Sequence, residues 1–217
     1  MTSSITHRKE VIETFCDACV WARTVRNYFL ALFEFNQCRL ALLEEVAAFL
    51  FHDLNIILIE YIFLQLCKLT DSDKTKVGKD YSNNLTTNYI LTLEWSPETL
   101  KGLQIKNDEL MAFRSKIIDA RRKLIAHNDL RTHLQSISLG SFSESDEREF
   151  WKSLQEFVDL AHSEAIGGPF PIDATMQGGD VFSLIHALKD GVDYEAVVAE
   201  DNGFLLKRWG KRRYEEA

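Results

Sequence analysis

The chain has 217 residues, 46% of them apolar, and a net charge of −8 at pH 7. This length allows one domain with a sizeable core, or at most two small ones. An acidic chain repels polyphosphate as a whole, so a nucleic-acid-binding role requires a local basic patch. Residues 1–10 contain no apolar signal core. We therefore expect no secretory signal and a cytoplasmic protein with reduced cysteines.

Two long helices open the predicted fold. Apolar residues recur at helical spacing over residues 7–35, from Ile12 to Phe33. A second helix over residues 38–69 is apolar around most of its surface, which is typical of a helix buried in a bundle or in a dimer interface. Polar residues such as His52, Asp53 and Glu60 interrupt its most apolar stretch and argue against a membrane span.

The middle of the chain predicts shorter elements. Residues 70–84 are polar and rich in turn formers, and a short helix is expected over residues 85–93. Ser96 is expected to cap a helix that starts at Pro97, and Asn107 to cap the next, which runs to about residue 127. Ser143 or Ser145 caps a further helix with a one-sided apolar stripe from Phe150 onward. We expect no strand pair.

Glycine and proline become frequent near the C-terminus and suggest a boundary. We predict an all-α helical bundle over residues 1–166 and a C-terminal extension over residues 167–217. The extension holds a short helix, capped by Asp180 and ending near Gly191, and a basic tail around residues 207–213. That tail fits either a nucleic-acid contact strip or a solvated terminus.

A local basic segment occupies residues 114–133. It carries six basic residues against two aspartates, which is the minimum that a phosphate-binding site requires. Pairs of apolar residues recur every seven positions, and Arg114 and Arg121 point along the same stripe. Because burial of an unpaired guanidinium is costly, each arginine should meet an anion or open onto a cleft.

The sequence RRKLIAHND at residues 121–129, preceded by a long helical pair ending in LTD, resembles the HEPN superfamily. More narrowly, it is similar to the abortive-infection AbiU-type branch. The hallmark of the family is an arginine, four to six arbitrary residues and a histidine, so both Arg121 and Arg122 pair with His127. The residue after the arginine is usually polar in the family, often Asn or Asp. Here it is Arg122 or Lys123, which leaves the choice of arginine open.

The resemblance, over residues 10–165, implies a bundle that dimerises through its long helices and cleaves RNA without metal or cofactor. His127 would move protons at the ribose 2′-hydroxyl or the leaving oxygen, and an arginine would stabilise the transition state. The products would carry 2′,3′-cyclic phosphate and 5′-hydroxyl ends. On an ideal helix His127 lies about 120° from Arg121 and about 140° from Arg122. For an arginine and the histidine to act together, the helix must therefore end near Ala126, or a second copy of the chain must supply one of the two residues.

The candidate residues fall into three groups. They are catalytic Arg121, Arg122 and His127, RNA-binding Arg114, Lys116, Lys123 and Arg131, and supporting Asp71, Asn128 and Asp129.

The resemblance also implies partners. We expect RNA, a second copy of the chain and a nucleotidyltransferase-type antitoxin, and no membrane, as in a toxin or phage-defence effector. The alternatives are a non-catalytic HEPN-like module that binds a nucleotide, RNA or a protein, and a purely structural helical dimer.

Two further groups of residues invite metal-site interpretations. Cys16 and Cys19 form a C-x-x-C without a second pair of ligands, so we expect core thiols and no metal. Asp53 and Glu60 share a helix face and fit either a polar seam or partners for the buried arginines.

Overall fold

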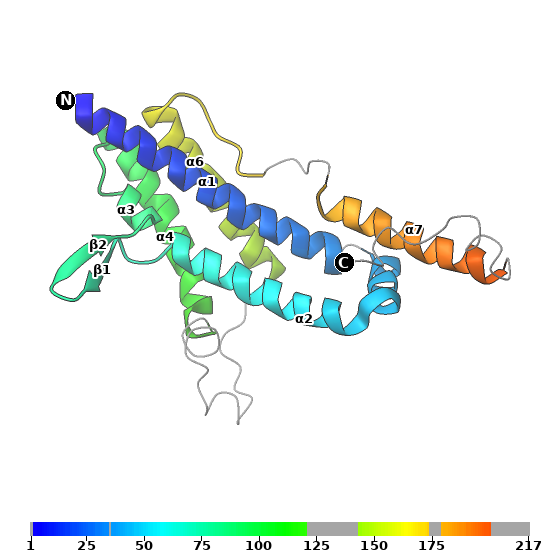
Figure 1. Cartoon of the computed structure of the whole chain (residues 1–217). Helices are drawn as coiled ribbons and strands as arrows, with labels where there is room; N and C mark the ends of the chain where they lie inside the picture. Colours follow the sequence, from blue (N-terminus) through cyan, green and yellow to red (C-terminus); the bar gives the residue numbers. More distant parts are fainter. Residues whose placement is uncertain (1, 35, 121–142, 174–178, 201–217) are drawn as a thin grey trace. The chain divides into compact units, whose positions relative to one another are not determined.

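The computed structural model describes residues 2–34, 36–120, 143–173 and 179–200, and these are mostly helical (Figure 1). The prediction of an all-α protein is confirmed except for one small hairpin. By its contacts the chain divides into two compact units, Met1–Asn27 with Ile56–Ala174, and Tyr28–Asn55 with Thr175–Ala217. The predicted boundary at residue 166 stays a prediction. The elements are α1 (Thr2–Phe33), α2 (Gln37–Leu69), β1 (Lys74–Val77), β2 (Asp80–Asn83), α3 (Thr87–Ile90), α4 (Pro97–Ala120), α6 (Glu144–Ala165) and α7 (Val181–Glu200).

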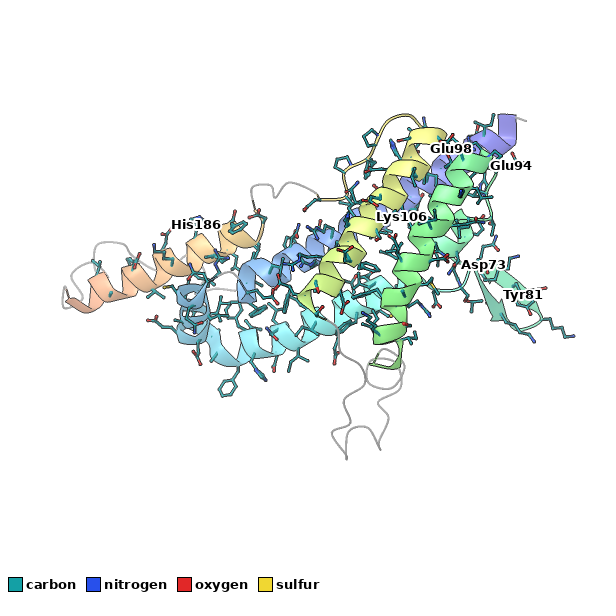
Figure 2. The ribbon with its side chains drawn as sticks, turned by 180° about the vertical axis from the view of Figure 1, so that it is seen from behind. Asp73, Tyr81, Glu94, Glu98, Lys106 and His186 are labelled. Atoms are coloured by element: carbon teal, nitrogen blue, oxygen red, sulfur yellow. The ribbon has the colours of Figure 1, made fainter. Side chains whose placement is uncertain are left out.

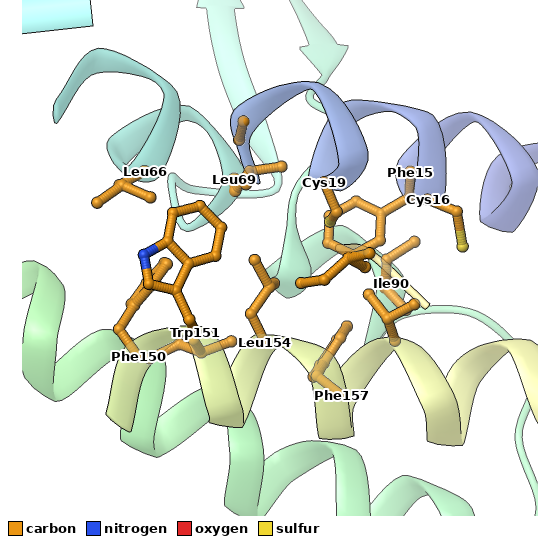
Figure 3. Packing of buried hydrophobic residues seen from close by; sticks show 14 of the residues in the cluster. Phe15, Cys16, Cys19, Leu66, Leu69, Ile90, Phe150, Trp151, Leu154 and Phe157 are labelled. Carbon is orange, nitrogen blue, oxygen red and sulfur yellow. The ribbon is translucent and has the colours of Figure 1, made fainter. Parts of the chain in front are cut away.

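The core of the first unit lies between α1, the end of α2, α4 and α6 (Figure 3). Phe15 of α1 and Phe157 of α6 are fully buried, and their rings meet edge to face with centroids 6.0 Å apart. Helices α4 and α6 approach closely at Gly102, where an added Cβ would lie 3.0 Å from Leu160 Cδ1. A larger residue at this position would therefore require the Leu160 side chain to shift by a few tenths of an ångström.

Helix α6 forms as its sequence predicts. Its apolar stripe, from Phe150 to Ala161, is buried. Ser143 is the N-cap: its hydroxyl accepts a hydrogen bond from the Asp146 N–H, and the Asp146 carboxylate accepts one from the Ser143 N–H. This capping box satisfies two helix-end donors. It also decides between the two predicted caps in favour of Ser143.

Asn107 does not cap a helix, and this prediction is wrong. Helix α4 is continuous from Pro97 to Ala120, and Asn107 is buried in its middle. Its Nδ2 donates to Asn88 Oδ1 at 3.0 Å, so a tertiary contact provides the partner that we assigned to a helix end. The short helix predicted over residues 85–93 is a single turn, Thr87–Ile90, capped by Thr86.

The polar stretch after α2 contains a strand pair, contrary to our expectation. Strands β1 and β2 are antiparallel and joined by a two-residue loop in which Gly78 has a φ of +64°. A positive φ is accessible to glycine at little steric cost. All eight strand residues are exposed, so no alternation of apolar and polar residues marks the strands in the sequence.

Helix α2 is apolar and interrupted. Its backbone is non-helical at Ala47. Among the helices of the described residues it alone is long and apolar enough to cross a membrane by length and composition, and 6% of its most apolar stretch is buried. One such helix is weak evidence of a membrane span, because the mostly buried core helices of soluble proteins also pass a test on length and composition.

In the second unit, α7 is longer than predicted and continues past Gly191 to Glu200. Asp180 does cap it: its Oδ1 accepts from the Phe182 N–H at 2.9 Å. The guanidinium of Arg39, at the start of α2, lies over the Phe182 ring, 5.5 Å from its centroid.

Candidate functional site

Arg114 meets an anion, as its position on the apolar stripe of α4 predicts. Its Nη2 donates to Asp71 Oδ1 at 2.8 Å. The Arg114 side chain is only 16% exposed, whereas that of Asp71 is 38% exposed. Asp53 and Glu60, the other partners that we considered for the buried arginines, are exposed and make no ion pair with any described residue. The partner of Arg114 is therefore one of the residues predicted to support the site.

A polar network holds Asp71 in place. Asn88 Nδ2 donates to the Asp71 carbonyl oxygen at 2.7 Å, and Asn88 Oδ1 in turn accepts from Asn107. The turn after α2 is thereby tied to α3 and to the middle of α4. This fixes the backbone that carries the carboxylate, and the carboxylate orients Arg114.

The ion pair borders a hollow lined by Asp71, Ser72, Asp73, Asn88, Met111 and Arg114. Arg114 Nε is buried and makes no hydrogen bond with any described residue. A buried donor without a partner costs about 1–3 kcal/mol. The buried Nε is shielded from the hollow, so only the Nη donors that Asp71 leaves unused are available to a second anion there.

Lys116 is engaged with the start of α6. Its Nζ lies 2.7 Å from Asp146 Oδ1. The hydrogen bond from Lys116, followed by that from the Ser143 N–H, lowers the pKa of the Asp146 carboxyl to about 2. The ion pair thus joins the end of α4, just before residue 121, to the start of α6, just after residue 142.

Most of the predicted catalytic segment lies outside the described residues. This applies to Arg121, Arg122, Lys123, His127, Asn128, Asp129 and Arg131, and also to the basic tail around residues 207–213. Their proposed roles stay predictions. Of the ten site residues, the structure describes Asp71, Arg114 and Lys116, and it brings the first two together.

A second hollow, which we did not predict, lies between α1 and α6. Its lining includes Arg23, Arg26, Arg148, Trp151 and Lys152. Arg23 pairs with Asp173 at 2.8 Å and lies over the Trp151 ring, and Arg26 pairs with Glu147. The spacing of basic residues one turn apart on each helix is the signal that could have found it. Because Arg23 and Arg26 are each paired with a carboxylate, this cluster ties α1 to the start of α6 and to Asp173.

The cysteines of α1 are core thiols, as predicted. Cys16 and Cys19 are buried. Burial, then the charges of Asp17 and Asp159, raises the pKa of Cys16 to about 12, and burial raises that of Cys19 well above 9. Both therefore remain protonated at neutral pH. Within the described residues, no group of three or more His, Cys, Asp or Glu side chains is arranged to hold a metal ion.

Comparison with known proteins agrees with the sequence pattern. The family model described as AbiU2, of HEPN type, matches residues 6–190. No curated protein and no solved structure matches the chain. The matched region covers well over half of the chain and includes the Asp71–Arg114 pair and the segment from Arg121 to His127. The chain therefore belongs to the AbiU2 family of the HEPN superfamily.

Proposed function

We propose that this protein is a metal-independent endoribonuclease of the cytoplasm that acts as a toxin or phage-defence effector. The observation that carries the proposal is the sequence RRKLIAHND, directly after α4, in a chain of the AbiU2 family. Family membership supports a ribonuclease or abortive-infection role. Cleavage to 2′,3′-cyclic phosphate and 5′-hydroxyl ends is the specific chemistry that we propose.

Each residue has a defined role in this proposal. His127 moves the proton at the ribose 2′-hydroxyl or at the leaving oxygen. Arg121 or Arg122 stabilises the charge that develops on the phosphorus oxygens. Arg114 lies seven residues before Arg121 and is held by Asp71, and it contacts a neighbouring phosphate through the Nη donors that Asp71 leaves unused. Lys116, Lys123 and Arg131 add positive charge for the RNA backbone.

A second copy of the chain is part of the proposal. Helix α2 exposes large apolar side chains, among them Phe49 at 89%, Leu50 and Ile57. Soluble monomers rarely expose an apolar patch of this kind, and a partner helix would cover it. Dimerisation would also bring two Arg–His motifs together, which the geometry of a single straight helix does not do. A nucleotidyltransferase-type antitoxin is the proposed regulator.

One observation favours a different function. Arg122 and Lys123 stand where the family usually has a polar, often Asn or Asp, residue after its arginine. A non-catalytic module would use the same positive charge to hold a nucleotide, RNA or a protein. It differs from the enzyme in binding without cleavage.

The test is cleavage of end-labelled cellular RNA by the purified protein in excess EDTA. We expect fragments with cyclic phosphate ends and a rate loss of about 10²–10⁴ for His127→Ala. Arg121→Ala and Arg122→Ala, measured side by side, identify the catalytic arginine. Arg148→Ala, whose guanidinium pairs only with exposed Glu144 among the described residues, is the matched control and should cleave normally. Equal cleavage by wild type and His127→Ala would overturn the site. If wild type and His127→Ala both bind RNA and neither cleaves it, the protein is the non-catalytic binding module.

A further inference from the structure

The hairpin β1–β2 has two chemically different faces. Residues directly opposite in an antiparallel pair share a face, and the register pairs Lys74 with Asn83 and Lys76 with Tyr81. One face therefore carries two lysines, a tyrosine and an asparagine. The other carries Thr75, Val77, Ser82 and the only acidic strand residue, Asp80. Positive charge and the aromatic ring are thus gathered on one side.

The core of the protein does not account for this hairpin. Every strand residue is exposed, and Tyr81 is 66% exposed. Figure 2 shows Tyr81 on the hairpin, which projects beyond Asp73 and away from the helices. The hairpin therefore contributes no buried apolar surface. A large exposed aromatic residue in such a position is typical of a surface that contacts a ligand.

The base of the hairpin is nevertheless well held. The Asn84 N–H donates to the Asp73 carbonyl oxygen at 2.7 Å. The Asn84 side chain donates to the Ser72 carbonyl oxygen at 2.9 Å and to Thr75 Oγ1 at 2.8 Å. A two-stranded hairpin alone is marginally stable in water, and these bonds fix it to the chain that leaves α2.

The lysines of the hairpin retain their charge for a partner. The side chains of Lys76 and Lys79 make no hydrogen bond or ion pair with any residue in the described part of the chain, and the Lys74 ammonium approaches an acidic group there only at Asp73, 4.0 Å away. Ser72 and Asp73, at the base, line the same hollow as Arg114. The base of the hairpin thus adjoins α4, the helix that leads into the Arg121–His127 segment.

We propose that the hairpin is an arm that holds single-stranded RNA, with Lys74 and Lys76 on its phosphates and Tyr81 stacked on a base. Lysines with an interleaved aromatic residue match the backbone charge and base faces of a single strand, with little dependence on sequence. The nature of the ligand rests on the proposed function. The arm itself binds and positions RNA and takes no part in the chemistry.

The experiment measures binding of a fluorescein-labelled single-stranded oligoribonucleotide to the full chain carrying His127→Ala, which keeps the RNA intact. Adding Tyr81→Ala should weaken binding about 5- to 150-fold, the usual effect of losing one stacked base. Lys74→Gln with Lys76→Gln should reduce the slope of log K against log salt by about 1.4, because each phosphate contact contributes about 0.7. Val77→Ala, on the opposite face, and Lys101→Gln, on α4, are matched controls and should bind normally.

Cleavage by the same variants, with His127 restored, separates this inference from the proposed function. Wild-type cleavage with unchanged binding by the Tyr81 and lysine variants overturns the arm and leaves the ribonuclease intact. Binding that depends on the hairpin, without wild-type cleavage, supports the arm and overturns the ribonuclease. Absence of RNA binding by the intact chain overturns both. A melting temperature, measured by circular dichroism, within about 2 °C of that of the parent protein shows that each variant is folded, as expected for substitutions at exposed positions.

Discussion

Helix α6 and the hairpin β1–β2 belong to the same compact unit but use their residues in opposite ways. Helix α6 buries seven residues, from Phe150 to Ala161, against α1 and α4. The hairpin buries none of its eight. The difference shows that mutations in α6 will affect the stability of the fold, whereas mutations in the hairpin will affect only the binding of a ligand. Equivalent substitutions in the two regions should therefore give unequal losses of stability.

The largest contrast is between two aromatic residues. Phe157→Ala removes a fully buried ring that contacts Phe15 and should lower the free energy of unfolding by about 3–5 kcal/mol. Tyr81→Ala should change it by less than about 0.5 kcal/mol, because Tyr81 is exposed. Chemical denaturation measures both. Similar losses in the two variants would show that the hairpin is packed against something in the native protein.

A smaller contrast concerns hydroxyl groups. Ser143→Ala removes the N-cap of α6 and half of its capping box, and should cost about 0.5–2 kcal/mol of stability. Thr75→Ala, on the hairpin, loses only an exposed acceptor for Asn84 and should cost less. Ser143→Asp, which can also cap the helix, should restore most of the loss. Failure of this rescue would contradict the capping role.

The smallest effect is electrostatic and depends on pH. Lys116→Met should raise the pKa of Asp146 from about 2 toward its ordinary value of 3.8, whereas Lys76→Met should leave it unchanged. A carboxyl with a lowered folded-state pKa stabilises the protein above its unfolded-state pKa and loses that contribution as pH falls. The stability difference between wild type and Lys116→Met should therefore be full above about pH 4 and disappear near pH 2.

An NMR titration of the side-chain carboxyl carbons measures this pKa directly. An Asp146 carboxyl that titrates alike in wild type and Lys116→Met would mean that the 2.7 Å contact contributes little in solution.

The contrast between the regions also explains which parts of the fold the sequence could predict. The apolar stripe and serine cap of α6 are local patterns, and both predictions are confirmed. The hairpin has no apolar face, so its pattern resembles that of a loop. Asn107 was misassigned because its partner, Asn88, is 19 residues away in the chain.

The site was predictable to a similar degree. Helical register placed Arg114 on a buried face and required an anion, but only the fold shows that Asp71, 43 residues away, supplies it. The family was predictable from RRKLIAHND and is confirmed by the match over residues 6–190. The hollow between α1 and α6 was missed because its basic residues lie on two separate helices.

The cysteines give the protein a built-in reporter of its own opening. Cys16, Cys19 and Cys67 are buried, whereas Cys38 is exposed. Thiolates are the species that react with alkylating reagents, and burial both shields a thiol and keeps it protonated. Cys38 is thus labelled in the native state, while the other three become reactive only when the helices separate. The rate at which a second label appears therefore records how often the core of the first unit opens.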